Sequence, residues 1–183
     1  MNYDPSNWYW LADDGRLYAS SSQTLVNKTD DAYVAWSSAG SKPTPWPQDE
    51  NGEQSNAALQ EVLSPYGRFV DLAAYAASKR YSVETGGYTF NGHPIATDRD
   101  SQGKITSVAV AATTVGSSFS TEWKCVDGTF LTLNHDDAIS MATAVMIFVS
   151  NCFATEASVV GAITAGTTTT MAAIDSADWP TGS

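Results

Sequence analysis

The stretch that most constrains this chain runs from Asn134 to Ala165 and has the pattern of one long helix. Asn134 is a residue type that caps a helix, because its side chain accepts hydrogen bonds from the free amides of the first turn. Asp136 and Asp137 follow it, and negative charge is favoured at this end of the helix dipole. The sequence therefore predicts a long helix that begins close to Asn134.

Two apolar stripes run along this predicted helix. The first has steps of three and four residues and is broken by Glu156; it comprises Ile139, Ala142, Met146, Val149, Phe153, Val160 and Ile163. The second comprises Ala138, Met141, Val145, Phe148, Cys152, Val159 and Ala162. Together they are wider than a two-stranded coiled coil needs, so the helix must be covered on two sides. Two interpretations remain open: a central helix packed within its own domain, or one that also meets copies of itself.

Composition limits the partners. The chain has 183 residues, of which 43% are apolar, and this is enough for a real core in one domain or two small ones. Its 20 acidic and 9 basic residues give a formal charge of −11, and no Lys/Arg cluster occurs. Nucleic acid and anionic membranes are therefore poor partners.

Neither a signal peptide nor a membrane span is predicted. Residues 1–10 are polar and acidic where a signal peptide would carry positive charge and an apolar run. The long helix contains Ser, Thr, Asn and Glu, so we expect a soluble protein made in a cytoplasm. Cys125 and Cys152 have neither metal-type nor redox-type spacing and are expected to be small buried residues, with a disulfide as the alternative.

The first part of the chain combines short strands and helices. Asp14-Gly15 is a hairpin turn signal between two aromatic runs, and residues 29–38 have the caps of a short helix. Residues 42–47 contain three prolines and must be extended, with Trp46 held against another part of the chain. Ser55 caps a helix that stops at Pro65, and apolar spacing predicts another helix over residues 66–81.

The second part alternates hairpins with helices. Asn91-Gly92 and Asp127-Gly128 are turn signals of two β-hairpins. Between them Thr97 and Asp100 form a capping box that opens a helix, and the second hairpin leads into the long helix. The predicted fold is α+β: a small aromatic-rich module that contains β-strands (1–52), a helical link (53–82), and a mainly helical module with two hairpins and one long C-terminal helix (83–183).

No catalytic residue, cofactor site or metal site is predicted, and we do not expect an enzyme. His93 follows a hairpin turn, where a loop side chain is the ordinary interpretation. His135 precedes two acidic residues in the first turn of a helix, where acids are favourable without a ligand. Asp98 and Asp100 belong to a capping region, and no phosphate loop, nucleophile elbow or zinc pattern occurs.

Several segments, in their order and spacing, are similar to a domain-of-unknown-function family encoded among the tail genes of tailed bacteriophages and prophages. The resemblance covers roughly residues 70–180 and rests on Lys79-Arg80-Tyr81, Glu84-Thr85-Gly86-Gly87, Asn91-Gly92, Thr97-Asp98-Arg99-Asp100-Ser101-Gln102, Trp123-Lys124, Asp127-Gly128 and Cys152-Phe153. Residues 31–36, 43–47 and 63–67 resemble N-terminal segments that accompany that domain in tail and fibre-associated proteins. The resemblance implies a virion or virion-assembly role and carries no established active site.

The leading hypothesis is a structural component of a tailed-phage virion, at or near the tail fibres or baseplate. The alternative is a tail-fibre assembly chaperone, and a minor alternative is a polymer hydrolase. Other tail proteins are the expected partners. Self-association is also expected, and a trimer is favoured because phage fibres are commonly trimeric, as the resemblance implies. The contact candidates are Trp8, Trp10, Trp46, Met146, Val149 and Phe153. We expect the N-terminal module to make the specific contact, because so small a module cannot bury all its rigid aromatic groups.

Overall fold

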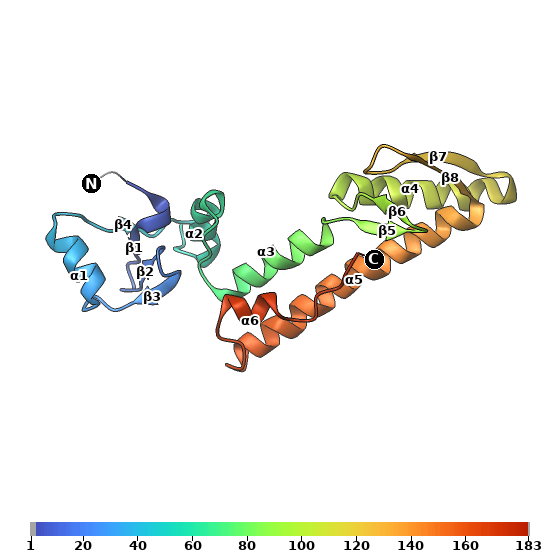
Figure 1. Ribbon diagram of the computed structural model, residues 1–183. Coiled ribbons are helices and arrows are strands. Elements are labelled where there is room, and N and C mark those ends of the chain that lie inside the picture. The colour runs from blue at the N-terminus through green and yellow to red at the C-terminus, as the bar shows by residue number, and fades with distance from the viewer. Residues whose placement is uncertain (1–2, 183) are drawn as a thin grey trace. The chain divides into compact units, whose positions relative to one another are not determined.

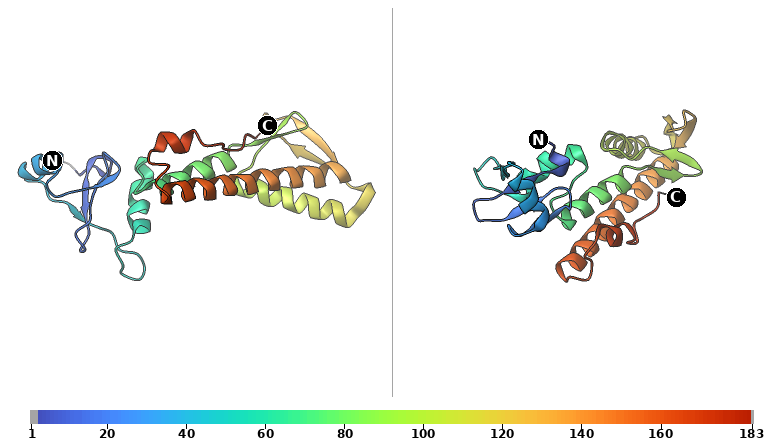
Figure 2. Two further views of the ribbon diagram at one scale, coloured as in Figure 1. Left: turned by 90° about the horizontal axis from the view of Figure 1, so that it is seen from below. Right: turned by 60° about the vertical axis from the view of Figure 1, so that its left-hand side comes forward.

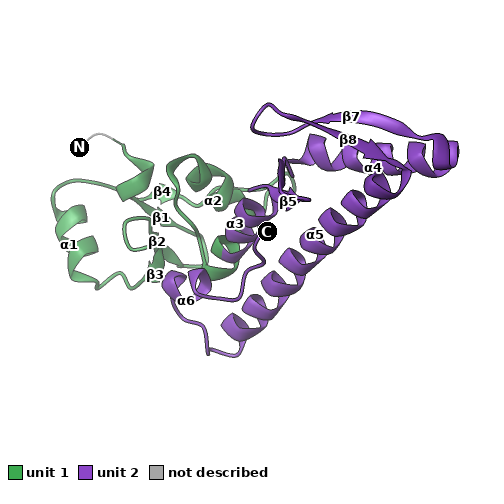
Figure 3. Ribbon diagram, turned by 45° about the vertical axis from the view of Figure 1, so that its right-hand side comes forward, with its two compact units in different colours: residues 1–75 green, residues 76–183 purple. Residues whose placement is uncertain are grey.

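The computed structural model describes residues 3–182. The chain forms two compact units, residues 1–75 and residues 76–183 (Figure 3). Both contain helices and short strands, so the predicted α+β class is confirmed (Figure 1). Each unit has its own hydrophobic core, and the two are described separately below.

The first unit is built on a small sheet with the strand order β3-β2-β1-β4. Strands β1 (Tyr9–Leu11) and β2 (Leu17–Ala19) form the predicted hairpin, with Trp10 opposite Tyr18. Strand β3 (Thr24–Val26) pairs antiparallel with β2. The proline segment is extended as predicted, and its β4 (Thr44–Pro45) adds to β1 in parallel.

The helices of this unit begin at side-chain caps. A 3-10 turn, η1 (Pro5–Asn7), precedes the sheet. Helix α1 (Asp31–Ser38) is capped by Asp30, whose carboxylate accepts from the Tyr33 amide at 3.1 Å. Helix α2 (Asn56–Leu63) is capped by Ser55 as predicted, and continues into η2 (Ser64–Tyr66).

The core of the first unit is mostly aromatic. Trp8, Trp10, Tyr18 and Trp46 are buried together with Leu59 and Leu63 of α2. Ring pairs with centroids about 5 to 6 Å apart, such as Trp8 with Trp36 at 5.0 Å, hold the cluster in specific geometry. This aromatic cluster therefore depends on α2 as well as on the sheet.

The second unit contains the two predicted hairpins. Strands β5 (Tyr88–Phe90) and β6 (His93–Ile95) turn at Asn91-Gly92, and both turn residues have positive φ, as this hairpin type requires. Strands β7 (Ser120–Lys124) and β8 (Phe130–Asn134) turn at Asp127-Gly128. The sequence signals for both hairpins are confirmed.

Helices precede, separate and follow these hairpins along the chain. Helix α3 (Leu72–Glu84) begins in the first unit and ends in the second; α4 (Arg99–Val115) is followed by η3 (Gly116–Ser118). The long helix α5 (His135–Thr164) is capped by Asn134 as predicted, and a last helix, α6 (Met171–Asp175), follows. Helices α4, α3 and α6 all lie beside α5 (Figure 2).

Two details differ from the sequence prediction. The helix predicted over residues 66–81 begins only at Leu72, where Asp71 accepts from the Ala74 amide at 2.8 Å, because residues 64–66 form a 3-10 turn. Asp98, and not Thr97, caps α4: its carboxylate accepts from the Ser101 amide at 3.0 Å. The Thr97 side chain is buried and has a different set of partners.

The core of the second unit lies between α4, α5 and the hairpins. Ile105 of α4, Leu133 of β8 and Met141 of α5 are fully buried there. The second apolar stripe of the long helix supplies most of the α5 contribution. Six of its seven members, Ala138, Met141, Val145, Phe148, Cys152 and Val159, are buried.

The division into units predicts how truncations behave. A fragment of residues 72–183 keeps α3 and the whole core of the second unit, so it should fold and melt cooperatively by circular dichroism. A fragment of residues 55–183 also carries α2, whose Leu59 and Leu63 lose the aromatic cluster that covers them. It should bind more of a hydrophobic dye than the shorter fragment. A 72–183 fragment without a cooperative transition would show that the second unit needs the first to fold.

A candidate interaction surface on α4 and α5

The contact residues predicted from sequence divide into two groups. Trp8, Trp10 and Trp46 are 9%, 1% and 2% exposed, so they lie within the core of the first unit. The expectation that a module this small could not bury them is wrong, because α2 packs over the sheet and completes the core. Met146 and Phe153 are 66% and 50% exposed, and Val149 is half-buried.

The buried tryptophans also have hydrogen-bond partners within the fold. The Trp8 indole donates to Thr44 Oγ1 at 2.9 Å, and the Trp46 indole donates to the Ser55 carbonyl at 2.9 Å. Most buried indoles donate to such an acceptor, and these two contacts fix the proline segment and the start of α2 against the sheet. These two side chains therefore have structural roles in the first unit.

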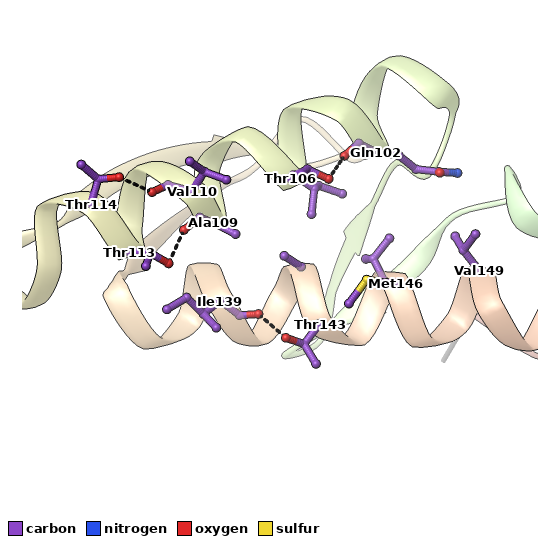
Figure 4. Close-up of a pocket in the computed structure, with 13 residues that line it drawn as sticks. Gln102, Thr106, Ala109, Val110, Thr113, Thr114, Ile139, Thr143, Met146 and Val149 are labelled. Carbon is purple, nitrogen blue, oxygen red and sulfur yellow. Dashed lines mark hydrogen bonds between the residues drawn. The ribbon is translucent and has the colours of Figure 1, made fainter.

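The second unit leaves an apolar groove open between α4 and α5 (Figure 4). Its volume is about 500 Å³, and it is lined by α4 from Gln102 to Thr114 and by α5 from Ile139 to Val149. Four members of the first stripe, Ile139, Ala142, Met146 and Val149, line this groove. Most of the second stripe is buried in the core instead. The two stripes therefore have different surroundings, which the sequence alone did not separate.

Threonines make up much of the groove wall, yet the wall is apolar. Thr106, Thr113 and Thr143 each donate their hydroxyl to the backbone carbonyl four residues earlier, at 2.8 to 3.0 Å (Figure 4). This bond uses the hydroxyl hydrogen within the helix and directs it away from any ligand. What remains for a partner is mainly the methyl groups, so the groove is suited to an apolar occupant.

A partly buried ionic cluster lies next to the groove. Arg80 of α3 donates from Nε to Glu156 of α5 at 3.0 Å and pairs through Nη1 with Glu84, which is 5% exposed. The Arg80 guanidinium also stacks on Phe153, 4.4 Å from the ring centre. Glu156, whose charge interrupts the first apolar stripe of α5, is thus the residue of α5 to which α3 is bonded through Arg80.

Further hydrogen bonds tie this cluster to α4 and the first hairpin. Gln102 of α4 donates to Glu84 Oε1 at 3.1 Å and to the Thr97 carbonyl at 2.8 Å. The Thr97 hydroxyl donates to the Glu84 carbonyl at 2.7 Å and accepts from the Gly87 amide at 2.9 Å. Residues from several of the segments on which the family resemblance rests therefore meet in one place, and they form a packed network.

The two cysteines are free and buried, as predicted. Burial raises the pKa of the Cys152 thiol, and the nearby Glu84 carboxylate raises it further, while Arg80 acts in the opposite direction. In the part of the chain that the structure describes, no three His, Cys, Asp or Glu side chains are grouped to hold a metal ion.

Helix α5 also passes the usual length and composition test for a membrane span. The mean hydropathy of its most apolar window is 1.7, and 28% of that window is buried within the protein. Core helices of soluble proteins pass the same test. The Ser, Thr, Asn and Glu residues of α5 therefore do not exclude a membrane span. That this helix does not span a membrane stays a prediction.

The ionic cluster can be tested by two matched substitutions in adjacent residues of α3. Arg80→Met leaves the Glu84 carboxylate buried without its positively charged partner, and the free energy of unfolding should fall by about 3 kcal/mol. Lys79→Met removes only a solvated pair with Asp175, 3.1 Å long, and should cost no more than about 0.5 kcal/mol. Urea denaturation measures both. Equal losses would contradict a special role of Arg80.

The raised pKa of Cys152 predicts slow alkylation. A raised pKa means less thiolate at a given pH, and the thiolate is the reactive form. At pH 8, iodoacetamide should modify Cys152 in the folded protein at a small fraction of its rate in denaturant, with mass spectrometry following each cysteine. Equal rates in the two conditions would show that the thiol is accessible.

Comparison with known proteins covers the second unit and the end of the first. Residues 70–178, which are more than half of the chain, match the domain of unknown function DUF4376. Nothing among curated proteins matches the chain, and no solved structure does. The matched region contains the groove, the ionic cluster and both hairpins of the second unit. The chain therefore belongs to the DUF4376 family.

Proposed function

We propose that this protein is a structural component of a tailed-phage virion, located at or near the tail fibres or baseplate, and that it acts through protein contacts. The observation that carries the proposal is the open apolar face of α4 and α5 in the family domain. The phage assignment itself is supported by the sequence resemblance of residues 70–180 and of the N-terminal segments. Synthesis in the host cytoplasm precedes assembly into the tail.

The exposed side chains support a contact role. Met146 and Phe153 of α5 are each at least half exposed, and Val110 of α4 is 62% exposed. Removing apolar surface from water contributes about 25 cal/mol per Å², so covering these residues would stabilise an assembly. Contiguous apolar surface on a folded protein is typical of sites where proteins meet. Self-association and binding to another tail protein both use this kind of surface.

An assembly chaperone for the tail fibre remains the second candidate. The same groove could hold an apolar segment of an unfinished fibre and release it later. A hydrolase is less well supported, because Asp98, its best candidate carboxylate, accepts from the Ser101 amide and hydroxyl at 3.0 and 2.6 Å. These bonds lower the pKa of Asp98, which is the wrong direction for a general acid at neutral pH.

Quantitative mass spectrometry of purified particles tests the proposal. A structural component should be present at a fixed copy number relative to other tail proteins, and that ratio should survive further rounds of purification. An abundant cytoplasmic host protein, followed in the same samples, corrects for carry-over. Complete loss of the chain during purification would contradict the structural role and leave the chaperone.

A further inference from the structure

We infer that the exposed face of α5 pairs with the same face of a second copy of this chain, antiparallel and about a two-fold axis that passes near Met146. This inference rests on the proposed function in one respect: it takes this face to act through protein contact. It adds the identity of the partner, the direction of the helices and the register.

The first argument is the repeat of the exposed stripe. Ile139, Met146, Phe153 and Val160 recur at intervals of seven residues, and the structure leaves Met146 and Phe153 exposed. A straight helix has 3.6 residues per turn, so a strict seven-residue stripe stays in contact only with a helix that supercoils with it. A second α5 carries the same repeat by identity and therefore matches it along its length.

The second argument is charge. The protein has a formal charge of −11, yet the described residues that line the groove include no ionisable side chain. The nearest acid on the stripe, Glu156, is paired with Arg80. A basic partner would find no acid here to bind, whereas a neutral partner is accommodated without a buried charge. A second copy presents the same neutral face.

We place the two-fold axis at Met146 because it is the most exposed member of the stripe, at 66%. A two-fold axis at Met146 places each Met146 beside its own counterpart. Because Ile139 and Phe153 lie seven residues on either side, the axis also places Ile139 of each copy opposite Phe153 of the other. Such an isologous interface covers Met146 and Phe153, the two exposed members of the stripe, in both copies at once, whereas Val160 lies beyond the paired region.

The acidic residues at the start of α5 decide the direction. In a parallel pair or a parallel trimer, Asp136 and Asp137 of every copy would come together at one end, beside equally oriented helix dipoles. In the antiparallel pair the two helix dipoles oppose each other. The acids of one copy then lie near the cluster of Arg80, Glu84 and Glu156 of the other, which has one guanidinium and two carboxylates and so a formal charge of −1. The antiparallel arrangement therefore carries less repulsion than the trimer favoured from sequence.

The size of the face agrees with a dimer of moderate affinity. With the axis at Met146, the two α5 helices overlap from His135 to Ala157, which is about 33 Å at 1.5 Å per residue. With α4 about 10 Å to one side, the face covers on the order of 600 Å² per copy. Stable interfaces bury roughly 800 Å² per partner, so we expect a dissociation constant in the micromolar range.

Sedimentation equilibrium of the full chain tests whether the partner of this face is a second copy of the chain. The average mass should rise with concentration from 19.5 kDa toward twice that value. A monomer at all concentrations up to about 200 μM, well above the expected micromolar dissociation constant, would overturn the inference. A limiting mass of three chains would overturn the two-fold symmetry.

Two substitutions on α5 locate the interface. Met146→Glu places two carboxylates at the axis and should raise the dissociation constant about a hundredfold. Ile147→Glu is the matched control, because Ile147 is 54% exposed but does not line the groove. It should change the dissociation constant less than about threefold. Equal effects would contradict the register. Thermal unfolding shows whether both variants keep the native fold.

Cysteine cross-linking distinguishes an antiparallel pair of α5 helices from a parallel pair. The double variant Ile139→Cys with Phe153→Cys should form a disulfide-linked dimer under mild oxidation, because the two positions face each other between copies. Ile139→Cys alone should remain uncross-linked, as should the natural protein with its two buried cysteines. A cross-linked dimer of the single variant would show that the helices are parallel.

These outcomes are separate from the virion test. If the chain is present in particles but monomeric in solution, the proposed dimer is contradicted and the proposed structural role is not. If the chain is dimeric in solution but missing from particles, the proposed structural role is contradicted and the proposed pairing of α5 is not.

Discussion

The second unit depends on one shared guanidinium. Arg80 is the single group through which α3 is bonded to Glu156 in the middle of α5 and to Glu84 in its own helix. A buried arginine is stable only when its donors are matched, and here two carboxylates match it. Glu84 in turn holds Gln102 of α4, and its carbonyl holds Thr97 at the exit of the first hairpin. Three helices and a hairpin thus share one polar centre.

Around that centre, α5 has two different apolar sides. The side with Met141 and Phe148 closes the core, whereas the side with Met146 and Phe153 stays in contact with solvent. Because one side of α5 packs in the core and the other is open to solvent, the apolar surface of the helix is wider than a single packing contact requires. It also explains the position of Glu156, because the ion pair stands where α3 and not α4 neighbours the helix.

Local signals in the sequence were sufficient for much of the fold. The Asn134 cap, the Asn91-Gly92 turn and the Ser55 cap each act within a few residues, so the elements they begin or connect were predicted correctly. Long-range contacts were not predictable in the same way. Arg80 and Glu156 are 76 positions apart, and no local pattern indicates their pairing. The burial of Trp46 likewise required knowing that Ser55 supplies its acceptor.

The threonines of the groove also affect how its wall is hydrated. A wall of valines with the same shape would offer no polar atom, and newly made chains would adhere to one another without specificity. Thr106, Thr113 and Thr143 keep hydroxyl oxygens that water can still reach while the groove is empty, because each oxygen has a lone pair to spare after donating to the backbone. The empty groove therefore presents hydroxyl oxygens to water as well as methyl groups, and these oxygens keep its wall hydrated.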